Sequence, residues 1–334
     1  MRRAGVAQRD RRVSGDGKTP GPASRTISRA AALTTVLCLL CWVLIVRGEI
    51  YRWTDAEGRT HFGDRPPVEL REQAQDLSAS LEGHVPFRFE IIPVEYAMPA
   101  QTHAKVEVAV AKIHHIYRSR LGLRFRADPS FAIRIFADQD AFSRYGDGPT
   151  LRGLASGYFS PARNEAVTWR QRSFAQMLEV ITHEANHALL HHAFGPVPPW
   201  LNEGLSEYFE RMEVFGQAVV IPPNPHWEAL IKAKLRDGSI TPLADYLGLG
   251  QRDWQVHDLS GNRAYAQAWS VVYFLMSSPK GTSLLARILD ELGARGASDF
   301  APAEVIESGY DGGLPALETA WRAWALGPKQ AHYY

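Results

Sequence analysis

The residues with the clearest chemical potential are His183, Glu184 and His187. Histidines four apart on a helix lie one turn apart on the same face, so both imidazoles can reach one metal ion. Glu184 lies beside them, where its carboxylate can meet a water molecule on that ion. This HExxH spacing is typical of zinc hydrolases, in which the metal is a Lewis acid and the glutamate a general base. We expect one Zn²⁺ ion, held in part by the two histidines.

The sequence offers several candidates for the third ligand. A catalytic zinc site with two histidines needs one more protein ligand and an open position for water. A following helix, which we expect to begin near Trp200, supplies two carboxylates, Glu203 and Glu207. His191, four residues after His187, can line the site or cap the last turn of the metal helix. From the residues alone, Glu203 and Glu207 are rivals for the ligand role.

The segment from His183 to Glu210 resembles the gluzincin zinc peptidases of the peptidase MA clan, in particular the DUF1570-like and peptidase-MA-like domains. The matching features are HExxH, then Trp-Leu-Asn-Glu-Gly, then Ser-Glu-Tyr-Phe. The resemblance implies a zinc peptidase that acts on a peptide or protein substrate. The residue roles that it implies are zinc ligation by His183, His187 and Glu203, general acid and base catalysis by Glu184, and a hydrogen bond from a zinc-binding histidine to Glu207.

Tyr265 is a candidate for stabilising the charge that develops on the attacked carbonyl oxygen. It lies near the start of a predicted helix from Asn262 to Met276, and related domains carry a tyrosine near the metal in a similar Tyr-Ala-Gln context. A tyrosine at helical spacing can equally be a core residue. Both interpretations remain open for Tyr265.

The elements that position these residues follow an α+β pattern. We expect the metal helix from about Ser173 to His192, because Gly195 and three prolines follow it. The predicted strands are Arg88 to Val94, Phe131 to Phe136, Gly157 to Ser160 and Ala166 to Arg170. The other predicted helices are Thr102 to Arg120, Trp227 to Leu235, Ser283 to Leu292 and Leu317 to Trp324.

The resemblance to the gluzincins implies that residues 87–330 form a zincin-like domain, with a small mixed sheet, the HExxH helix and a mostly helical C-terminal part. The strand pair before the metal helix has two interpretations. In the first, one strand runs along the cleft and pairs with an extended peptide; in the second, the pair is a core hairpin. His114 and His115 are adjacent on a helix, so their side chains diverge and a shared ion is disfavoured.

The N-terminal region predicts export. Residues 1–29 carry eight Arg or Lys against two acids, a surplus of +6, which leaves −5 on the rest of the chain, whose total is +1. An uncharged apolar stretch, Ala30 to Val46, lies between Arg29 and Arg47. Its 17 residues fit either a signal peptide or a single anchor in the inner membrane, within residues 30–47. Basic residues stay in the cytoplasm, so the chain from residue 48 onward is expected in the periplasm.

The charge and cysteine patterns exclude two classes of protein. The basic surplus is confined to the tail, so we do not expect a nucleic-acid binder. Both cysteines, Cys38 and Cys41, lie in the apolar stretch. The exported part therefore has no disulfide and no thiolate ligand, and a metal site there must use histidines and carboxylates.

Residues 49–67 predict a small β-hairpin around Asp55 to Gly58, closed by Pro66 and Pro67. Residues 68–86 are polar and are expected to form a linker. The hairpin resembles the DUF4124 domain of bacterial envelope proteins, which implies little about chemistry. The matching residues are Tyr51, Trp53, Asp55, Gly58, His61, Phe62, Asp64, Pro66 and Pro67.

Two functions follow as hypotheses. The first is an exported, zinc-dependent metallopeptidase with Glu184 as the general base. The alternative is a non-catalytic module of the cell envelope that keeps the zincin fold and binds a partner. Glu184 separates them, because a purely structural zinc site has no use for a base.

Overall fold

The computed structural model describes residues 51–54, 60–63, 71, 73, 75–76, 87–125, 129–146, 156–258 and 263–334. The chain divides into two units, residues 1–47 and 48–334. The predicted basic tail and apolar segment lie outside the described residues. Within the described ranges, no helix has both the length and the apolar character needed to cross a membrane.

The predicted N-terminal hairpin is confirmed. Strand β1 (Tyr51–Thr54) pairs antiparallel with β2 (Thr60–Gly63), and the connecting turn lies outside the described residues. A third strand, β3 (Gln75–Asp76), pairs with the other edge of β1. It lies in the range predicted as a linker. The strand was not predicted, because two residues are too few to show the alternation of a strand. The order of this small sheet is β2-β1-β3.

A four-stranded mixed sheet forms one half of residues 87–334. Its order is β4 (Arg88–Val94), β5 (Ser130–Phe136), β7 (Glu165–Trp169) and β6 (Gly157–Ser160). The first three strands are parallel, and β6 is antiparallel to β7 at the edge. The register pairs Gly157 with Thr168 and Ser160 with Glu165. The predicted strand pair is therefore real, and its first strand lies at the edge of the sheet.

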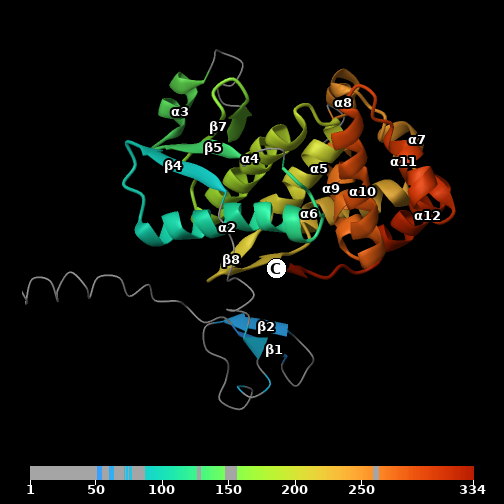
Figure 1. Cartoon of the computed structure of the whole chain (residues 1–334), viewed down its shortest axis with the longest axis horizontal. Coiled ribbons are helices and arrows are strands. Elements are labelled where there is room, and N and C mark those ends of the chain that lie inside the picture. Colours follow the sequence, from blue (N-terminus) through green and yellow to red (C-terminus); the bar gives the residue numbers. More distant parts are fainter. Residues whose placement is uncertain are drawn as a thin grey trace, which may run out of the picture. The chain divides into compact units, whose positions relative to one another are not determined.

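Helices cover both faces of this sheet. On one face lie α2 (Ala100–Ser119) and the metal helix α4 (Phe174–Phe194), which pack against each other. Helix α2 buries Val106, Val110 and Ile113, which recur at the helical spacing of an amphipathic face. On the other face, α3 (Gln139–Tyr145) packs Phe142 into a smaller cluster around Val167. Figure 1 shows α2 running beside α4.

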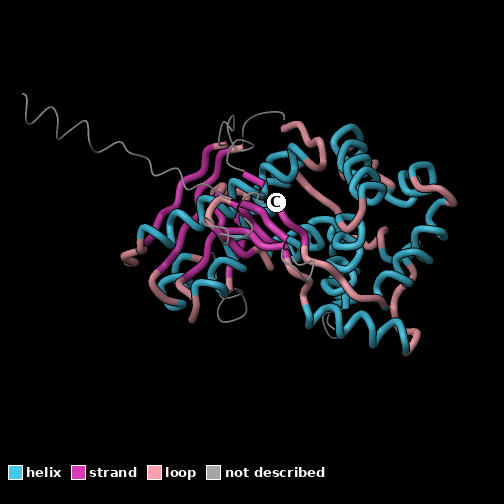
Figure 2. Tube along the Cα trace, turned by 90° about the horizontal axis from the view of Figure 1, so that it is seen from below, coloured by secondary structure: helices cyan, strands magenta, loops and turns pink. Residues whose placement is uncertain are grey.

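The second half is mainly helical (Figures 1 and 2). Helix α5 packs against both α4 and α9, so it joins the two halves. A three-stranded antiparallel sheet in the order β10-β9-β8 lies in the same half. The elements are α5 (Pro199–Glu210), β8 (Glu213–Phe215), β9 (Ala218–Ile221), α6 (Pro225–Arg236), α7 (Leu243–Tyr246), α8 (Gln251–Asp258), α9 (Arg263–Met276), α10 (Pro279–Arg295), α11 (Pro302–Gly309), α12 (Gly313–Leu326) and β10 (His332–Tyr333).

The α+β class predicted from the sequence is confirmed, with small sheets and a predominance of helix. The predicted helices match α2, α4, α5, α6, α9, α10 and α12 to within a few residues at most ends. The sequence analysis did not anticipate the sheet β8-β9-β10. Its strands have only two to four residues, and β10 is separated from β9 by about a hundred residues of helix.

Candidate metal centre

Local signals fix where the metal helix begins and ends. The side chain of Ser173 accepts a hydrogen bond from the Gln176 backbone N–H at 3.2 Å, so it caps the helix start. Gly195 ends the helix with a φ of 73°, a left-handed conformation that glycine adopts without strain. Pro199 then opens α5, where a proline costs no hydrogen bond. These signals bring the first turns of α5 beside the last turns of α4.

The structure brings the three predicted ligands together. The Nε2 atom of His183 lies 3.5 Å from Glu203 Oε2, and that of His187 lies 3.7 Å from the same oxygen. These three residues form one of two described groups of side chains close enough to hold a metal ion. In a tetrahedral zinc site with bonds of about 2.1 Å, ligand atoms are about 3.4 Å apart. The two histidine–carboxylate distances therefore match those of a zinc site.

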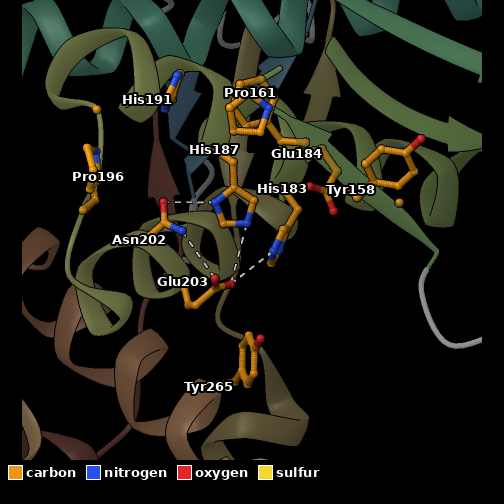
Figure 3. A pocket seen from close by; sticks show the side chains of 14 residues that line it. Tyr158, Pro161, His183, Glu184, His187, His191, Pro196, Asn202, Glu203 and Tyr265 are labelled. Atoms are coloured by element: carbon orange, nitrogen blue, oxygen red, sulfur yellow. Dashed lines mark hydrogen bonds and ion pairs between the residues drawn. The ribbon is translucent and has the colours of Figure 1, made fainter. Parts of the chain in front are cut away.

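The other ring nitrogens of both histidines are held by acceptors, of which Figure 3 shows the one at His187. His183 Nδ1 lies 3.1 Å from Glu210 Oε2, and a carboxylate oxygen can only accept. His187 Nδ1 lies 3.1 Å from Asn202 Oδ1, whose amide nitrogen is turned toward Glu203. Each Nδ1 therefore carries the proton, and each Nε2 is free to ligate a metal.

A buried hydrogen-bond chain continues from His187 into the core. Ser206 Oγ lies 3.2 Å from His187 Nδ1 and accepts a hydrogen bond from Asn186 at 2.9 Å. The Tyr117 hydroxyl on α2 donates to the Asn186 amide oxygen at 2.5 Å. Ser206, Asn186 and Tyr117 are all buried. The chain ties the orientation of the His187 ring to three helices.

Glu210, and not Glu207, contacts a histidine of the site. The sequence analysis gave Glu207 the hydrogen bond from a zinc-binding histidine. In the structure Glu207 is buried and accepts a hydrogen bond from Trp227 Nε1 at 2.7 Å. Burial and the nearby Glu210 carboxylate raise the pKa of Glu207 to about 7. Glu207 and Glu210 also form, with His183, the second described group that could hold a metal ion. That group has one histidine, so the donor set of two histidines fits zinc better.

Glu184 is positioned as an unpartnered carboxylate at the site. It is 9% exposed, and among the described residues its carboxylate makes no hydrogen bond or ion pair. Burial raises its pKa, although the two nearby histidines oppose the shift. A nearly buried carboxylate without a partner is costly for folding. Such groups are typical of functional sites.

The charges of the site favour a bound cation. Burial by itself would lower the pKa of His183, but its hydrogen bonds to Glu203 and Glu210 raise it well above the usual value. Burial opposes ionisation of Glu203, but the two histidines hold its pKa below the usual range. The carboxylates of the site therefore favour a positive charge between them and the two histidines. A divalent cation can supply it in place of a proton on the histidine.

A cavity of about 430 Å³ opens onto these residues. Tyr265, from α9, lines it and lies beyond Glu203 as seen from the two histidines (Figure 3). The ring of Tyr265 is half-buried and packs edge-on against Trp254. His191 also lines the cavity, with its ring 5.5 Å from that of Phe159. Both residues can therefore contact a molecule in the cavity.

Edge strand β6 forms one wall of the cavity through Gly157, Tyr158 and Phe159. The strand directly before the metal helix, β7, is paired on both sides and lies inside the sheet. A Cβ atom on Gly157 would lie 2.4 Å from Val180 Cγ1 and 3.2 Å from Glu184 Cγ. Only glycine allows this strand to approach α4 so closely beside Glu184.

The sequence analysis missed three contacts of the metal centre: Asn202, Ser206 and Glu210. A helical-wheel argument could have found Glu210, which is two turns after Glu203 on the same face of α5. Asn202 and Ser206 showed no such signal. The paired histidines on α2 do not form a site. His114 is buried between Phe87 and Phe125, at ring distances of 4.4 and 4.9 Å, and joins no described metal-binding group.

Comparison with known families adds one finding. Residues 37–80 match the family described as "Domain of unknown function (DUF4124)". This match confirms the predicted DUF4124 module and extends beyond its expected bounds of 49–67 at both ends. No curated protein matches this chain.

Proposed function

We propose that this protein is an exported zinc peptidase of the gluzincin type, with a zincin-like fold in residues 87–330. The observation that carries the proposal is the unpartnered carboxylate of Glu184 beside the free Nε2 atoms of His183 and His187 and the Glu203 carboxylate. A structural zinc site is closed by four protein ligands and needs no base. Three ligands, a base and an open cavity support catalysis instead.

The chain's own residues have separate roles in peptide hydrolysis. When bound, zinc supplies Lewis-acid chemistry and makes water a nucleophile at neutral pH. His183, His187 and Glu203 would hold it. Glu184 accepts a proton from the attacking water and returns it to the amine nitrogen that leaves. Glu184 is therefore again deprotonated at the end of the turnover.

The cavity walls would bind and orient the substrate. The Tyr265 hydroxyl would donate a hydrogen bond to the oxygen of the attacked carbonyl, where negative charge develops. The outer edge of β6 can pair with an extended peptide through backbone hydrogen bonds. Both roles suit a peptide or protein substrate.

We place the catalytic domain in the periplasm. The basic residues before Ala30 and the apolar stretch Ala30 to Val46 support export of the rest of the chain. The domain is then released by cleavage or held at the inner membrane by this stretch. The absence of cysteines from residue 48 onward is consistent with a site built from histidines and carboxylates.

The proposal can be tested on a chain that begins at residue 49. Zinc content would be measured together with cleavage of a peptide library, for the wild type and Glu184→Gln. We expect about one zinc ion per chain in both proteins, since Glu184 is not a ligand. We expect cleavage by the wild type and a loss of at least about 1,000-fold in the variant, because no other group replaces the base.

The outcomes separate the hypotheses. Zinc in both proteins without cleavage by either would favour the alternative, a non-catalytic binding module of the cell envelope. Absence of zinc at neutral pH would contradict both zinc-based functions.

A further inference from the structure

We propose that a second hollow, at the start of helix α4, binds a carboxylate of the substrate and so selects acidic peptides. This hollow, here called the basic subsite, has a volume of about 450 Å³. The inference rests on the proposed peptidase function for its biological meaning. The residues that line the basic subsite are Tyr96, Thr102, Trp169, Arg170, Gln171, Arg172, Ser173, Phe174 and Met177.

An intermediate hollow lies between the basic subsite and the metal centre. The intermediate hollow shares Gly157, His183 and Glu184 with the cavity at the metal centre. It shares Gln171 with the basic subsite. The three hollows therefore follow one another along α4, from the metal ligands toward the start of the helix.

The length of this path suits a peptide. Met177 and Phe174 precede Glu184 by seven and ten residues on α4, which corresponds to about 10 to 15 Å along the helix axis. An extended peptide advances about 3.3 Å per residue. A side chain three to five residues from the bond at Glu184 would therefore reach the basic subsite.

The charges along the path change sign. In the intermediate hollow, Glu179 is paired with Arg211, and Glu210 contacts His183. In the basic subsite, Arg170 and Arg172 are exposed and form no ion pair with an acid in the described part of the chain. Lys105, which is half-buried and has its ammonium 5.5 Å from the Phe174 ring centre, also forms no ion pair with a described acid. Positive charge at this end is uncompensated and is complementary to a carboxylate.

The apolar lining gives the basic subsite its shape. The guanidinium of Arg170 lies 5.7 Å from the centre of the Tyr96 ring, a stacking that restrains its position. Tyr96 follows β4, and Trp169 and Arg170 stand at the end of β7, so the hollow lies at the carboxyl ends of parallel strands. Ligands of α/β sheets commonly bind at this end. An Asp or Glu side chain and the peptide's C-terminus are the two sources of such a carboxylate.

Binding should be measured on the full chain carrying Glu184→Gln, so that peptides are not consumed. The probes are fluorescent decapeptides with one glutamate moved along an otherwise neutral sequence, each with a glutamine partner. A second series compares a free with an amidated C-terminus. We expect about tenfold tighter binding of the acidic peptide at the best position, weakened by added salt.

Variants assign the preference to the two arginines. In Arg170→Ala/Arg172→Ala the acidic and neutral peptides should bind equally. In Arg170→Glu/Arg172→Glu a lysine peptide should bind better than the acidic one. Arg236→Ala, which removes an exposed arginine on α6, is the matched control and should keep the wild-type preference.

Equal binding of acidic and neutral peptides by the Glu184→Gln protein with both arginines intact would overturn the inference. So would a preference that survives in the double variant, or the absence of peptide binding altogether. Wild-type protein that binds acidic peptides selectively but cleaves none would leave the basic subsite standing and contradict the peptidase proposal instead.

Discussion

At the residue scale, the candidate site depends on which ring nitrogen of each histidine is protonated. A histidine pair at i and i+4 can bind zinc only if both rings present a lone pair to the same point. Glu210 and Asn202 hold the two Nδ1 atoms, so that both Nε2 atoms face Glu203. The contacts behind the ligands thus decide whether the motif can work as a metal site.

We predict that Glu210→Gln lowers the affinity for zinc by about 10- to 100-fold. An amide at this position no longer fixes the Nδ1 proton of His183 as strongly as a carboxylate does. Zinc affinity can be measured by competition with a chromophoric chelator.

Glu207→Gln is the matched control for this prediction. It keeps an acceptor for Trp227, so we expect a smaller loss of zinc affinity than in Glu210→Gln. A larger loss in Glu207→Gln would show that Glu207 is the important acid and would contradict the assignment of Glu210.

At the scale of elements, the site depends on how closely α5 approaches α9. A Cβ atom on Gly204 would lie 2.8 Å from the Ala268 carbonyl oxygen and 2.8 Å from Val272 Cγ2. A carbonyl on a helix backbone cannot move aside easily. Glycine at this position therefore allows the contact between the two helices, and Glu203 is the neighbouring residue of α5.

We predict that Gly204→Ala destabilises the protein by about 1–3 kcal/mol, the usual cost of overpacking. It should also weaken zinc binding, because α5 must shift with Glu203 on it. Thermal unfolding and chelator competition measure the two effects.

Gly250→Ala provides the control, since a Cβ atom there meets nothing within 4 Å. Its stability should stay within about 0.5 kcal/mol of the wild type. Wild-type stability and zinc affinity in Gly204→Ala would show that the close approach is not required.

At the scale of the whole described domain, β10 links distant parts of the chain to α5. His332 Nδ1 lies 2.8 Å from the Tyr208 hydroxyl, and the His332 ring stacks on Tyr273 at 4.3 Å. The Tyr334 backbone exchanges two hydrogen bonds with Val219 on β9. The strand therefore holds together α5, α9 and the small sheet.

We predict that His332 makes stability depend on pH. Burial lowers its pKa from the usual 6.5 to about 4. As the pH falls below 6.5, the unfolded chain takes up a proton before the folded protein does, so stability that is complete above pH 6.5 is lost progressively down to about pH 4. The full loss is about 3 kcal/mol.

Denaturant unfolding at a series of pH values, for the wild type and His332→Phe, measures this effect. Phenylalanine keeps the stacking on Tyr273 and does not titrate, so the variant should lose less stability between pH 6.5 and 4. Above pH 7 the difference in stability between the two proteins should be constant. Equal pH dependence of both proteins would contradict the assignment.

The sequence by itself determined the motif and most of the helices and strands around it. Periodicity, Ser173, Gly195 and the prolines located α4 and α5, because caps and breakers act within a few residues. The same local rules put His183 and His187 on one face of a helix and Glu203 and Glu207 on the next helix, and the resemblance to the gluzincins favoured Glu203 as the ligand. The hairpin of residues 49–67 followed from turn and strand signals alone, and its resemblance to DUF4124 is confirmed.

Only the tertiary structure decided which side chains meet across elements. Glu210 contacts His183 and Glu207 turns to Trp227, although both acids lie within one turn on α5. Strand β6, and not β7, lines the cavity, and the basic subsite joins residues from β7, α2 and α4. These contacts depend on the packing of elements far apart in the chain. The spacing of residues along one helix or strand determines which side chains share a face of that element. Which other element that face contacts is determined by packing, so spacing alone cannot predict these contacts.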